Sequence, residues 1–180
     1  MNIVVYCSSR EGLDKKYQQL AQTLGSWIGQ NGHTLVYGGS NAGLMHVTAA
    51  AAHEAGGHVV GVIPEIFRHR IDPVCDEVVY TAHLAERKQV MIERGDVFVV
   101  LPGGIGTLDE WISTLTVMNI GEDDHRPVIV ADLDGLFADT VRQLETLTRT
   151  PFARGKDLTH TLIAHTPTDL ITSLSLVKKC

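Results

Sequence analysis

The stretch from Val97 to Glu110 reads Val-Phe-Val-Val-Leu-Pro-Gly-Gly-Ile-Gly-Thr-Leu-Asp-Glu, and its pattern sets the expectation for the whole fold. A continuous apolar run is typical of a strand that helices cover on both faces. The glycines that follow let the backbone approach a ligand closely, and they permit positive φ angles. Apolar residues then recur with a helical period. The stretch therefore predicts a buried strand, a tight glycine turn and a helix.

The same strand-to-helix pattern recurs along the chain. The candidate strands are Ile3–Cys7, Thr34–Tyr37, Val59–Ile63, Glu77–Tyr80, Val97–Leu101, Val128–Ala131 and Leu162–His165. The candidate helices are the segment between Asp14 and Gly32, then Gly43–Ala55, Ala82–Arg94, Thr107–Ile120, Leu136–Arg149 and Thr168–Val177. This alternation predicts an α/β fold, with a mostly parallel sheet of about seven strands flanked by helices, in one domain over residues 1–180. We expect the irregular stretch Arg149–Asp157 to be a surface loop.

The composition excludes several classes of protein. A chain of 180 residues with 44% hydrophobic residues suits one globular domain with a sizeable core. No apolar run approaches the roughly 20 residues of a membrane-spanning helix, and the first residues lack the pattern of a secretory signal. Cys7, Cys75 and Cys180 form no CxxC pair, so we expect no metal site, no disulfide framework and a cytoplasmic location. The net charge of −6 and the lack of a basic tract argue against nucleic acid as a partner.

Three loops are expected at the carboxyl edge of this sheet, where parallel α/β proteins bind ligands. They follow the first strand (Cys7–Arg10), the second strand (Gly38–Asn41) and the fifth strand (Pro102–Thr107). The start of the helix after the fifth strand offers free N–H groups to a phosphate. Neither glycine loop matches the dinucleotide fingerprint or the P-loop, and either one could be a plain turn. Two such turns on neighbouring carboxyl edges favour a shared anion site.

Two charged residues near that edge have both a functional and a structural interpretation. Glu110 could act on a ligand, or it could form a capping box with Thr107 and bond only the backbone. Arg87 lies on an apolar stripe with Leu84 and Met91. Its head could reach water, or its planar fork could bind a phosphate or a ribose oxygen. Because its helix runs antiparallel to the next strand, we expect Arg87 to lie near Glu110.

Other common catalytic arrangements have no support in the sequence. The pair His53 and His58 is one residue too far apart for the HExxH zinc motif, and two glycines interrupt the helix that the motif requires. No lysine has a setting that suggests a pyridoxal phosphate Schiff base. No GxSxG elbow is present to anchor a serine triad. We therefore expect no cofactor.

Taken together, several segments resemble the LONELY GUY (LOG) family. The resemblance rests on Leu84-Ala85-Glu86-Arg87-Lys88 and on the stretch from Leu101 to Glu110. Tyr37-Gly38-Gly39, Gly43-Leu44-Met45 and Gly61-Val62-Ile63-Pro64 are similar to other landmarks of the family, in the same order. The resemblance covers roughly residues 2 to 150.

The resemblance implies a fold, an activity and a set of site residues. It implies a Rossmann-like three-layer domain that forms a homodimer, with the site close to the subunit interface. The implied reaction hydrolyses the N-glycosidic bond of nucleoside 5′-monophosphates, either cytokinin riboside 5′-monophosphates or AMP, to free base and ribose 5-phosphate. The implied catalytic residues are Arg87 and Glu110. With the loops of the predicted edge included, the candidate substrate-binding residues are Ser8, Gly38, Gly39, Lys88, Gly103, Gly104, Ile105, Gly106, Thr107, Leu108, Asp109 and Thr116.

The sequence also departs from the family pattern. Leu84 stands where methionine is usual, Ser40 where a third glycine is usual, and Met118-Asn119-Ile120-Gly121 replaces a common segment after the helix. The segment Glu65–Cys75 is expected to be a loop, and it looks shorter than the loop usual in the family. These changes leave the preferred base open, and a broader purine monophosphate nucleosidase stays possible. A non-catalytic nucleotide or molybdenum cofactor carrier is the alternative, although a carrier has no need of both Arg87 and Glu110.

Overall fold

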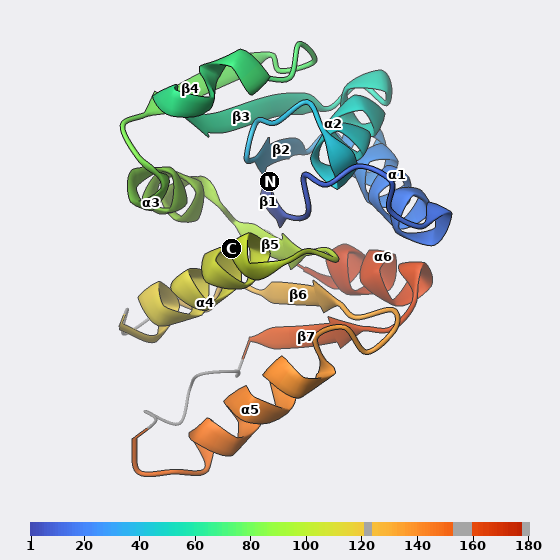
Figure 1. Cartoon of the computed structure of the whole chain (residues 1–180). Helices are drawn as coiled ribbons and strands as arrows, with labels where there is room; N and C mark the ends of the chain where they lie inside the picture. Colours follow the sequence, from blue (N-terminus) through green and yellow to red (C-terminus); the bar gives the residue numbers. More distant parts are fainter. Residues whose placement is uncertain (121–123, 153–159, 178–180) are drawn as a thin grey trace.

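A computed structural model describes residues 1–120, 124–152 and 160–177, and its strands form one parallel sheet. The strands are β1 (Asn2–Tyr6), β2 (Thr34–Tyr37), β3 (His58–Pro64), β4 (Glu77–Thr81), β5 (Val97–Val100), β6 (Val128–Ala131) and β7 (Thr161–Ala164). Their order in the sheet is β4-β3-β2-β1-β5-β6-β7, and each neighbouring pair is parallel (Figure 1). The predicted α/β fold is therefore confirmed.

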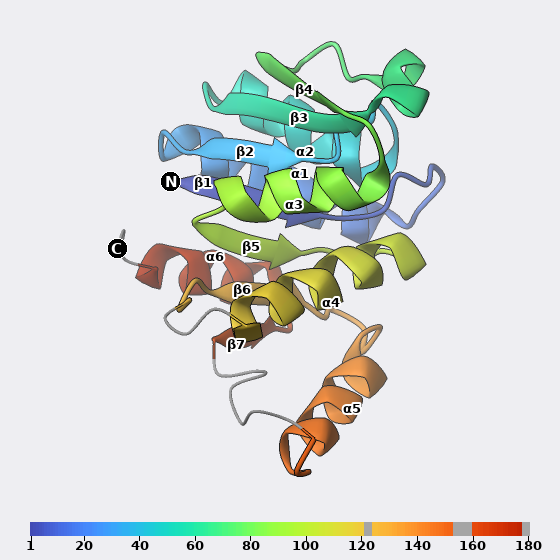
Figure 2. The ribbon, with the colours of Figure 1, turned by 90° about the vertical axis from the view of Figure 1, so that its left-hand side faces the viewer.

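Helices cover both faces of the sheet and make it the middle of three layers. The helices are α1 (Lys15–Gln30), α2 (Gly43–Glu54), α3 (Leu84–Arg94), α4 (Ile105–Ile120), α5 (Ala138–Thr148) and α6 (Pro167–Leu176). Figure 2 shows α3, α4 and α5 in front of the sheet, with α1, α2 and α6 behind it. The central strands are buried between two apolar clusters, one on each face. Within the described ranges, no helix has the length and apolar character needed to cross a bilayer.

The predicted elements are all present, with small shifts at their ends. The helix predicted from Thr107 begins at Ile105, because the backbone N–H of Leu108 already donates to the carbonyl of Gly104 (3.1 Å). The segment Glu65–Cys75 was expected to be a loop, and it contains a short 3₁₀ helix, η1 (Glu65–Arg70). The predicted surface loop from Arg149 lies outside the described residues from position 153 onward, and so does Cys180.

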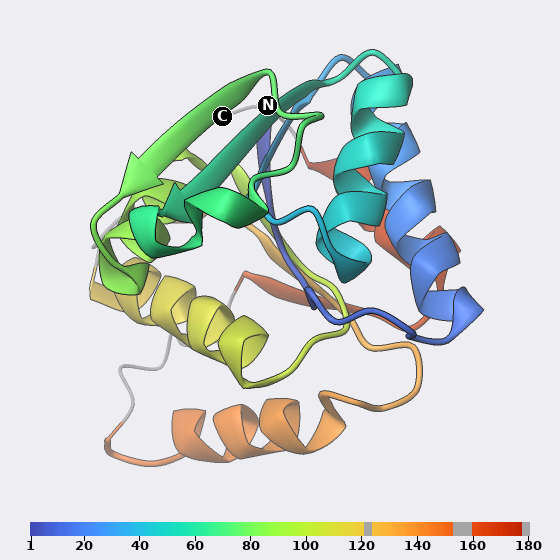
Figure 3. The same cartoon turned by 45° about the horizontal axis from the view of Figure 1, so that its top comes forward.

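Two glycines on α1 bring α1 and α2 into close contact. A Cβ atom on Gly25 would lie 2.3 Å from the carbonyl oxygen of Thr48, and one on Gly29 would lie 2.5 Å from that of Ala52. Both acceptors belong to the backbone of α2, which cannot move aside as a flexible side chain can. Figure 3 shows the two helices lying side by side on one face of the sheet. The spacing of α1 and α2 therefore depends on the absence of side chains at these positions.

We expect Gly29→Ala to destabilise the protein. Alanine favours a helix over glycine by about 1 kcal/mol, but the added Cβ forces two packed helices apart, at a cost of about 1–3 kcal/mol or more. The melting temperature should fall by several degrees, measured by circular dichroism. Gln22→Ala, an exposed change on the same helix, is the control and should leave it within about one degree. A melting temperature for Gly29→Ala at or above that of the wild type would contradict this account of the packing.

Candidate active site

The three loops expected at the carboxyl edge are joined by backbone hydrogen bonds. The N–H of Ser8, after β1, donates to the carbonyl of Pro102, after β5 (3.2 Å). The carbonyl of Ser8 in turn accepts from the N–H of Leu44, at the start of α2 (2.9 Å). The loop after β1 thus ties the glycine turn after β5 to the turn after β2. The N-terminal ends of α3 and α4 lie at this same edge (Figure 2).

A cavity of about 490 Å³ opens between these loops. The residues that line it are Cys7, Ser8, Ser9, Arg10, Met45, Arg87, Gly104, Ile105, Gly106, Thr107 and Glu110. The first turn of α4 forms one wall, and the first amides of a helix have no partner within the helix itself. The positive end of the α4 dipole therefore faces the cavity, together with the guanidinium groups of Arg10 and Arg87. This combination suits an anionic group.

The three glycines of the turn have different roles. At Gly104 and Gly106 a Cβ atom would meet nothing within 4 Å, so the backbone is open there. At Gly103 a Cβ atom would lie 2.0 Å from the Oγ1 of Thr107, so this glycine is required by the packing of the turn itself. None of the three has a positive φ. Freedom to adopt positive φ is therefore not what the turn uses, and the close approach of the backbone to a ligand applies to Gly104 and Gly106.

Glu110 is buried at the inner end of the cavity and pairs with Arg87. Its exposed fraction is 3%, and the Nη2 of Arg87 donates to its Oε1. The expected proximity of the two residues is thus confirmed. The capping-box alternative is wrong, because Thr107 lies inside α4 and the Glu110 carboxylate bonds a guanidinium on another helix. The interpretation of Arg87 as a head that escapes to water is also wrong, since only 14% of its side chain is exposed.

Burial changes the acid–base properties of the groups in this cavity. It raises the pKa of Glu110 to about 7, and the opposing effect of the Arg87 charge is smaller. Burial also raises the pKa of the Cys7 thiol, and the nearby Glu110 carboxylate adds to the rise. Cys7 therefore stays a neutral thiol at physiological pH and does not supply a thiolate nucleophile. Glu110 remains as the group that can gain or lose a proton near neutral pH.

A buried hydrogen-bond chain connects the backbone of Glu110 to β1. The Thr114 hydroxyl donates to the carbonyl of Glu110 (2.9 Å), so it accepts from the Tyr6 hydroxyl (2.8 Å). Thr114 and Tyr6 are almost entirely buried. This chain fixes the turn of α4 that carries Glu110 against the central strand of the sheet.

A second cavity of about 130 Å³ adjoins the first. The residues that line it are Ser9, Gly38, Ser40, Met45, Ile63, Phe67, Arg70 and Arg87. It lies between the turn after β2 and the short helix η1. Three of its lining residues, Ser9, Met45 and Arg87, also line the larger cavity.

The structure brings only some of the predicted site residues to these cavities. Ser8, Gly38, Arg87, Gly104, Ile105, Gly106, Thr107 and Glu110 line them. The Lys88 ammonium instead bonds the Asp109 carboxylate (2.7 Å) and the Ser113 hydroxyl (3.0 Å), between α3 and α4. Thr116 donates to a carbonyl of its own helix. Gly39, Gly103, Leu108, Lys88, Asp109 and Thr116 do not line either cavity.

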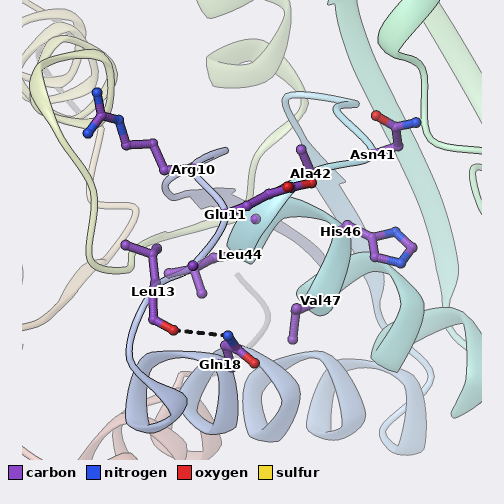
Figure 4. Close-up of a pocket in the computed structure, with 11 residues that line it drawn as sticks. Arg10, Glu11, Leu13, Gln18, Asn41, Ala42, Leu44, His46 and Val47 are labelled. Carbon is purple, nitrogen blue, oxygen red and sulfur yellow. Dashed lines mark hydrogen bonds between the residues drawn. The ribbon is translucent and has the colours of Figure 1, made fainter.

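Eight residues line the cavities but were absent from the predicted set: Cys7, Ser9, Arg10, Ser40, Met45, Ile63, Phe67 and Arg70. Ser9 and Arg10 follow Ser8 in a loop that was already expected at this edge. Their position in that loop, and not their residue type, could have identified them as site residues. Figure 4 shows the Arg10 side chain pointing away from Asn41 and His46. Arg10, Asn41 and His46 line a third cavity, of about 210 Å³, between the starts of α1 and α2. Arg10 is the lining residue that this cavity shares with the largest one.

Two solved structures show how widely this fold is used. The molybdenum cofactor binding protein from Rippkaea orientalis has a TM-score of 0.76 at 24% identity, over 97% of this chain and 94% of that one. The molybdenum cofactor carrier protein from Chlamydomonas reinhardtii has a TM-score of 0.75 at 22% identity, over 97% and 95% of the two chains. At these identities the likeness shows a common fold alone.

Sequence relatives are considerably more similar. A cytokinin riboside 5′-monophosphate phosphoribohydrolase from Mycobacterium tuberculosis is 39% identical over 137 residues, which make up 75% of this chain and 72% of that protein. The enzyme of the same name from Rhodococcoides fascians is 39% identical over 138 residues, 73% of this chain and 68% of that protein. The LOG enzyme of Oryza sativa subsp. japonica is also 39% identical, over 75% of this chain and 56% of that protein. The matched region thus spans little more than half the length of the Oryza sativa relative and about 70% of the other two.

A family described as possible lysine decarboxylase matches residues 45–174. This region contains both Arg87 and Glu110, along with the whole glycine turn after β5. The family match and the relatives at 39% identity agree with the resemblance found in the sequence motifs. These matches show that the chain belongs to the LOG family, whose sequence model is the one described as possible lysine decarboxylase.

Proposed function

We propose that the protein hydrolyses the N-glycosidic bond of nucleoside 5′-monophosphates and releases the free base and ribose 5-phosphate. The observation that carries the proposal is the buried Glu110 carboxylate, paired with Arg87, at the inner end of a cavity that a helix N-terminus opens onto. The relatives named as cytokinin riboside 5′-monophosphate phosphoribohydrolases support the same reaction.

In this proposal the substrate phosphate lies at the start of α4. The free amides of Ile105 and Gly106 and the helix dipole stabilise a dianion there without a basic surface. The guanidinium of Arg10, on the same cavity, adds a positive charge. The net charge of −6 is therefore compatible with an anionic substrate.

Glu110 acts on the reacting carbon. When the C1′–N bond breaks, its electron pair leaves with the base and positive charge develops on the ribose, as in other glycoside cleavages. A carboxylate beside that carbon stabilises the charge, and it accepts a proton from the water whose oxygen bonds to C1′. The departing base gains a proton, which Glu110 can return to it. One water is consumed, and its proton and hydroxyl end on the two products.

Arg87 holds the carboxylate in place and favours its ionised form. Because a guanidinium stays protonated at neutral pH, it serves as a fixed positive charge and not as a proton donor. Lys88, which is engaged with Asp109, is better placed to keep α3 and α4 together than to contact the reacting bond in this chain.

We further propose that the protein is a cytoplasmic homodimer of single-domain chains, as the family resemblance implies. Neither Cys7 nor Cys75 forms a disulfide with a described residue, which fits a reducing compartment. The helices α3 and α4 expose the apolar side chains of Leu84, Val117 and Ile120. These side chains are suited to contact with a second copy.

Glu110→Gln should separate catalysis from binding. If the carboxylate acts mainly on the transition state, kcat for AMP or isopentenyladenosine monophosphate should fall by about 10²- to 10⁴-fold. AMP binding, measured by calorimetry, should stay within about tenfold. Glu93→Gln, an exposed change on α3, is the matched control for turnover. Binding without release of base from either nucleotide by the wild type would instead favour the carrier function.

The pH dependence should report the ionisation of Glu110. Since the carboxylate is the active form, kcat/KM should rise with pH and level off above about 7. Arg87→Gln removes a charge that lowers the pKa of Glu110, so the inflection should move to higher pH. The substrate phosphate also titrates near pH 6, but this titration does not depend on Arg87. Arg94→Gln, at the far end of α3, is the control.

If the inflection stays at the same pH in Arg87→Gln, the ionising group that controls kcat/KM is not Glu110. A rate that falls as pH rises through 7 would mean that the neutral acid is the active form.

Light scattering tests the homodimer. The wild type should have about twice the chain mass of 19.6 kDa. Ile120→Glu, on the exposed end of α4, should shift the protein toward the monomer. Leu176→Glu, an equally exposed apolar position on α6 at the opposite face, should not. A wild-type mass of a single chain would contradict the dimer.

A further inference from the structure

The two cavities at the carboxyl edge form one composite site. Ser9, Met45 and Arg87 line both, so the cavities adjoin and a molecule in the larger one can reach the smaller one. On the proposed function, the phosphate lies at the start of α4 and the reacting carbon lies at Glu110. The base then has to lie beyond Glu110 and Arg87, and the smaller cavity is the space on that side of Arg87.

The polar side chains of the smaller cavity are hydroxyls and cations. They are the hydroxyls of Ser9 and Ser40 and the guanidinium groups of Arg70 and Arg87. No carboxylate or amide side chain is among its lining residues in the part of the chain that the structure describes. A guanidinium donates hydrogen bonds and accepts none. A serine hydroxyl can donate or accept, so the guanidinium groups set the balance. Beside Arg70 the lining favours a ligand edge rich in acceptors over one that presents an amino group.

Backbone hydrogen bonds hold the main chain of Arg70 in place. Its guanidinium group forms no ion pair with any described residue. Its carbonyl accepts from the N–H of Asn41 (3.0 Å), and the next residue, Ile71, pairs with Ser40 in a short antiparallel bridge. Asp72, which is buried and bonded to His46 (2.9 Å), donates its N–H to the carbonyl of Gly39 (2.9 Å).

Among the described residues, the head of Arg70 has one recorded partner, the ring of Phe67, whose centroid lies 5.9 Å away. The neighbouring Arg68 differs, because it pairs with Glu65 and stacks on Tyr80. Arg70 thus presents a free planar fork from a fixed backbone position.

We propose that Arg70 selects the base, and that the preferred substrates are 6-oxopurine nucleoside 5′-monophosphates such as IMP and GMP. The O6 and N7 atoms of a 6-oxopurine are two acceptors on one edge, and they match the two donors of a guanidinium fork. Adenine places an amino group where O6 would be, so it offers one acceptor and one donor. A substituent on that amino group adds bulk at the same point. Pyrimidines have no N7 atom, so they lack the O6/N7 pair of this edge.

A substrate panel with matched arginine variants tests the proposal. The wild type should have a kcat/KM for IMP about five- to 150-fold above that for AMP, the range expected for one bidentate contact. In Arg70→Gln the IMP/AMP ratio should fall toward one, chiefly through loss of IMP turnover. Arg68→Gln, on the same short helix but outside the cavity, should keep the wild-type ratio. Because Arg70 is exposed, its replacement should leave the melting temperature unchanged.

A binding experiment keeps the proposal independent of catalysis. Calorimetry with IMP and AMP on Glu110→Gln, with and without Arg70→Gln, should show the same preference and its loss. A wild type that cleaves no monophosphate would refute the proposed function, and the binding ratio would still decide the role of Arg70. A wild-type preference for AMP or for isopentenyladenosine monophosphate would overturn the proposal. So would an IMP preference that survives Arg70→Gln.

Discussion

The pairing of Arg87 with Glu110 is the interaction on which the arrangement of this edge depends. An ionised carboxylate that is 3% exposed needs a compensating charge, and the helix that carries Glu110 supplies none on its own inner face. Arg87 supplies it from α3. The pair joins α3 and α4 across the ends of the central strands, and its arginine lines both cavities. A single contact thus holds the reactive group in place, partly offsets the rise in its pKa that burial causes, and puts Arg87 where the two cavities meet.

The strand order brings the necessary loops to this pair. Because β1 lies between β2 and β5, the turns after these three strands are neighbours, and Ser8 bonds to the turns on both sides. The segment after β3 reaches the same place by another route. Backbone bonds from Asn41 and Asp72 attach η1 to the turn after β2. The site is therefore assembled from four loops that the sheet positions.

Most of the fold and part of the site could be predicted from local patterns. Continuous apolar runs identified the seven strands, and the antiparallel course of α3 predicted that Arg87 would approach Glu110. Contacts made by residues distant in sequence could not be predicted in this way. Nothing local distinguishes Arg70 from Arg68, since their difference lies in whether Glu65 and Tyr80 are within reach. Likewise, the requirement for glycine at position 29 comes from the backbone of α2, more than twenty residues away.

The placement of arginines at this edge has a consequence for how a substrate arrives. Arg10, Arg70 and Arg87 line the cavities of a protein whose net charge is −6. At distances well beyond the Debye length, about 8 Å at physiological ionic strength, an approaching dianion is repelled by the whole molecule and attracted only when it is near the edge. Modest salt then weakens the distant repulsion more than the attraction inside the cavity. The encounter rate should consequently hold steady or increase with ionic strength, the reverse of the behaviour of enzymes that attract anions with a basic surface.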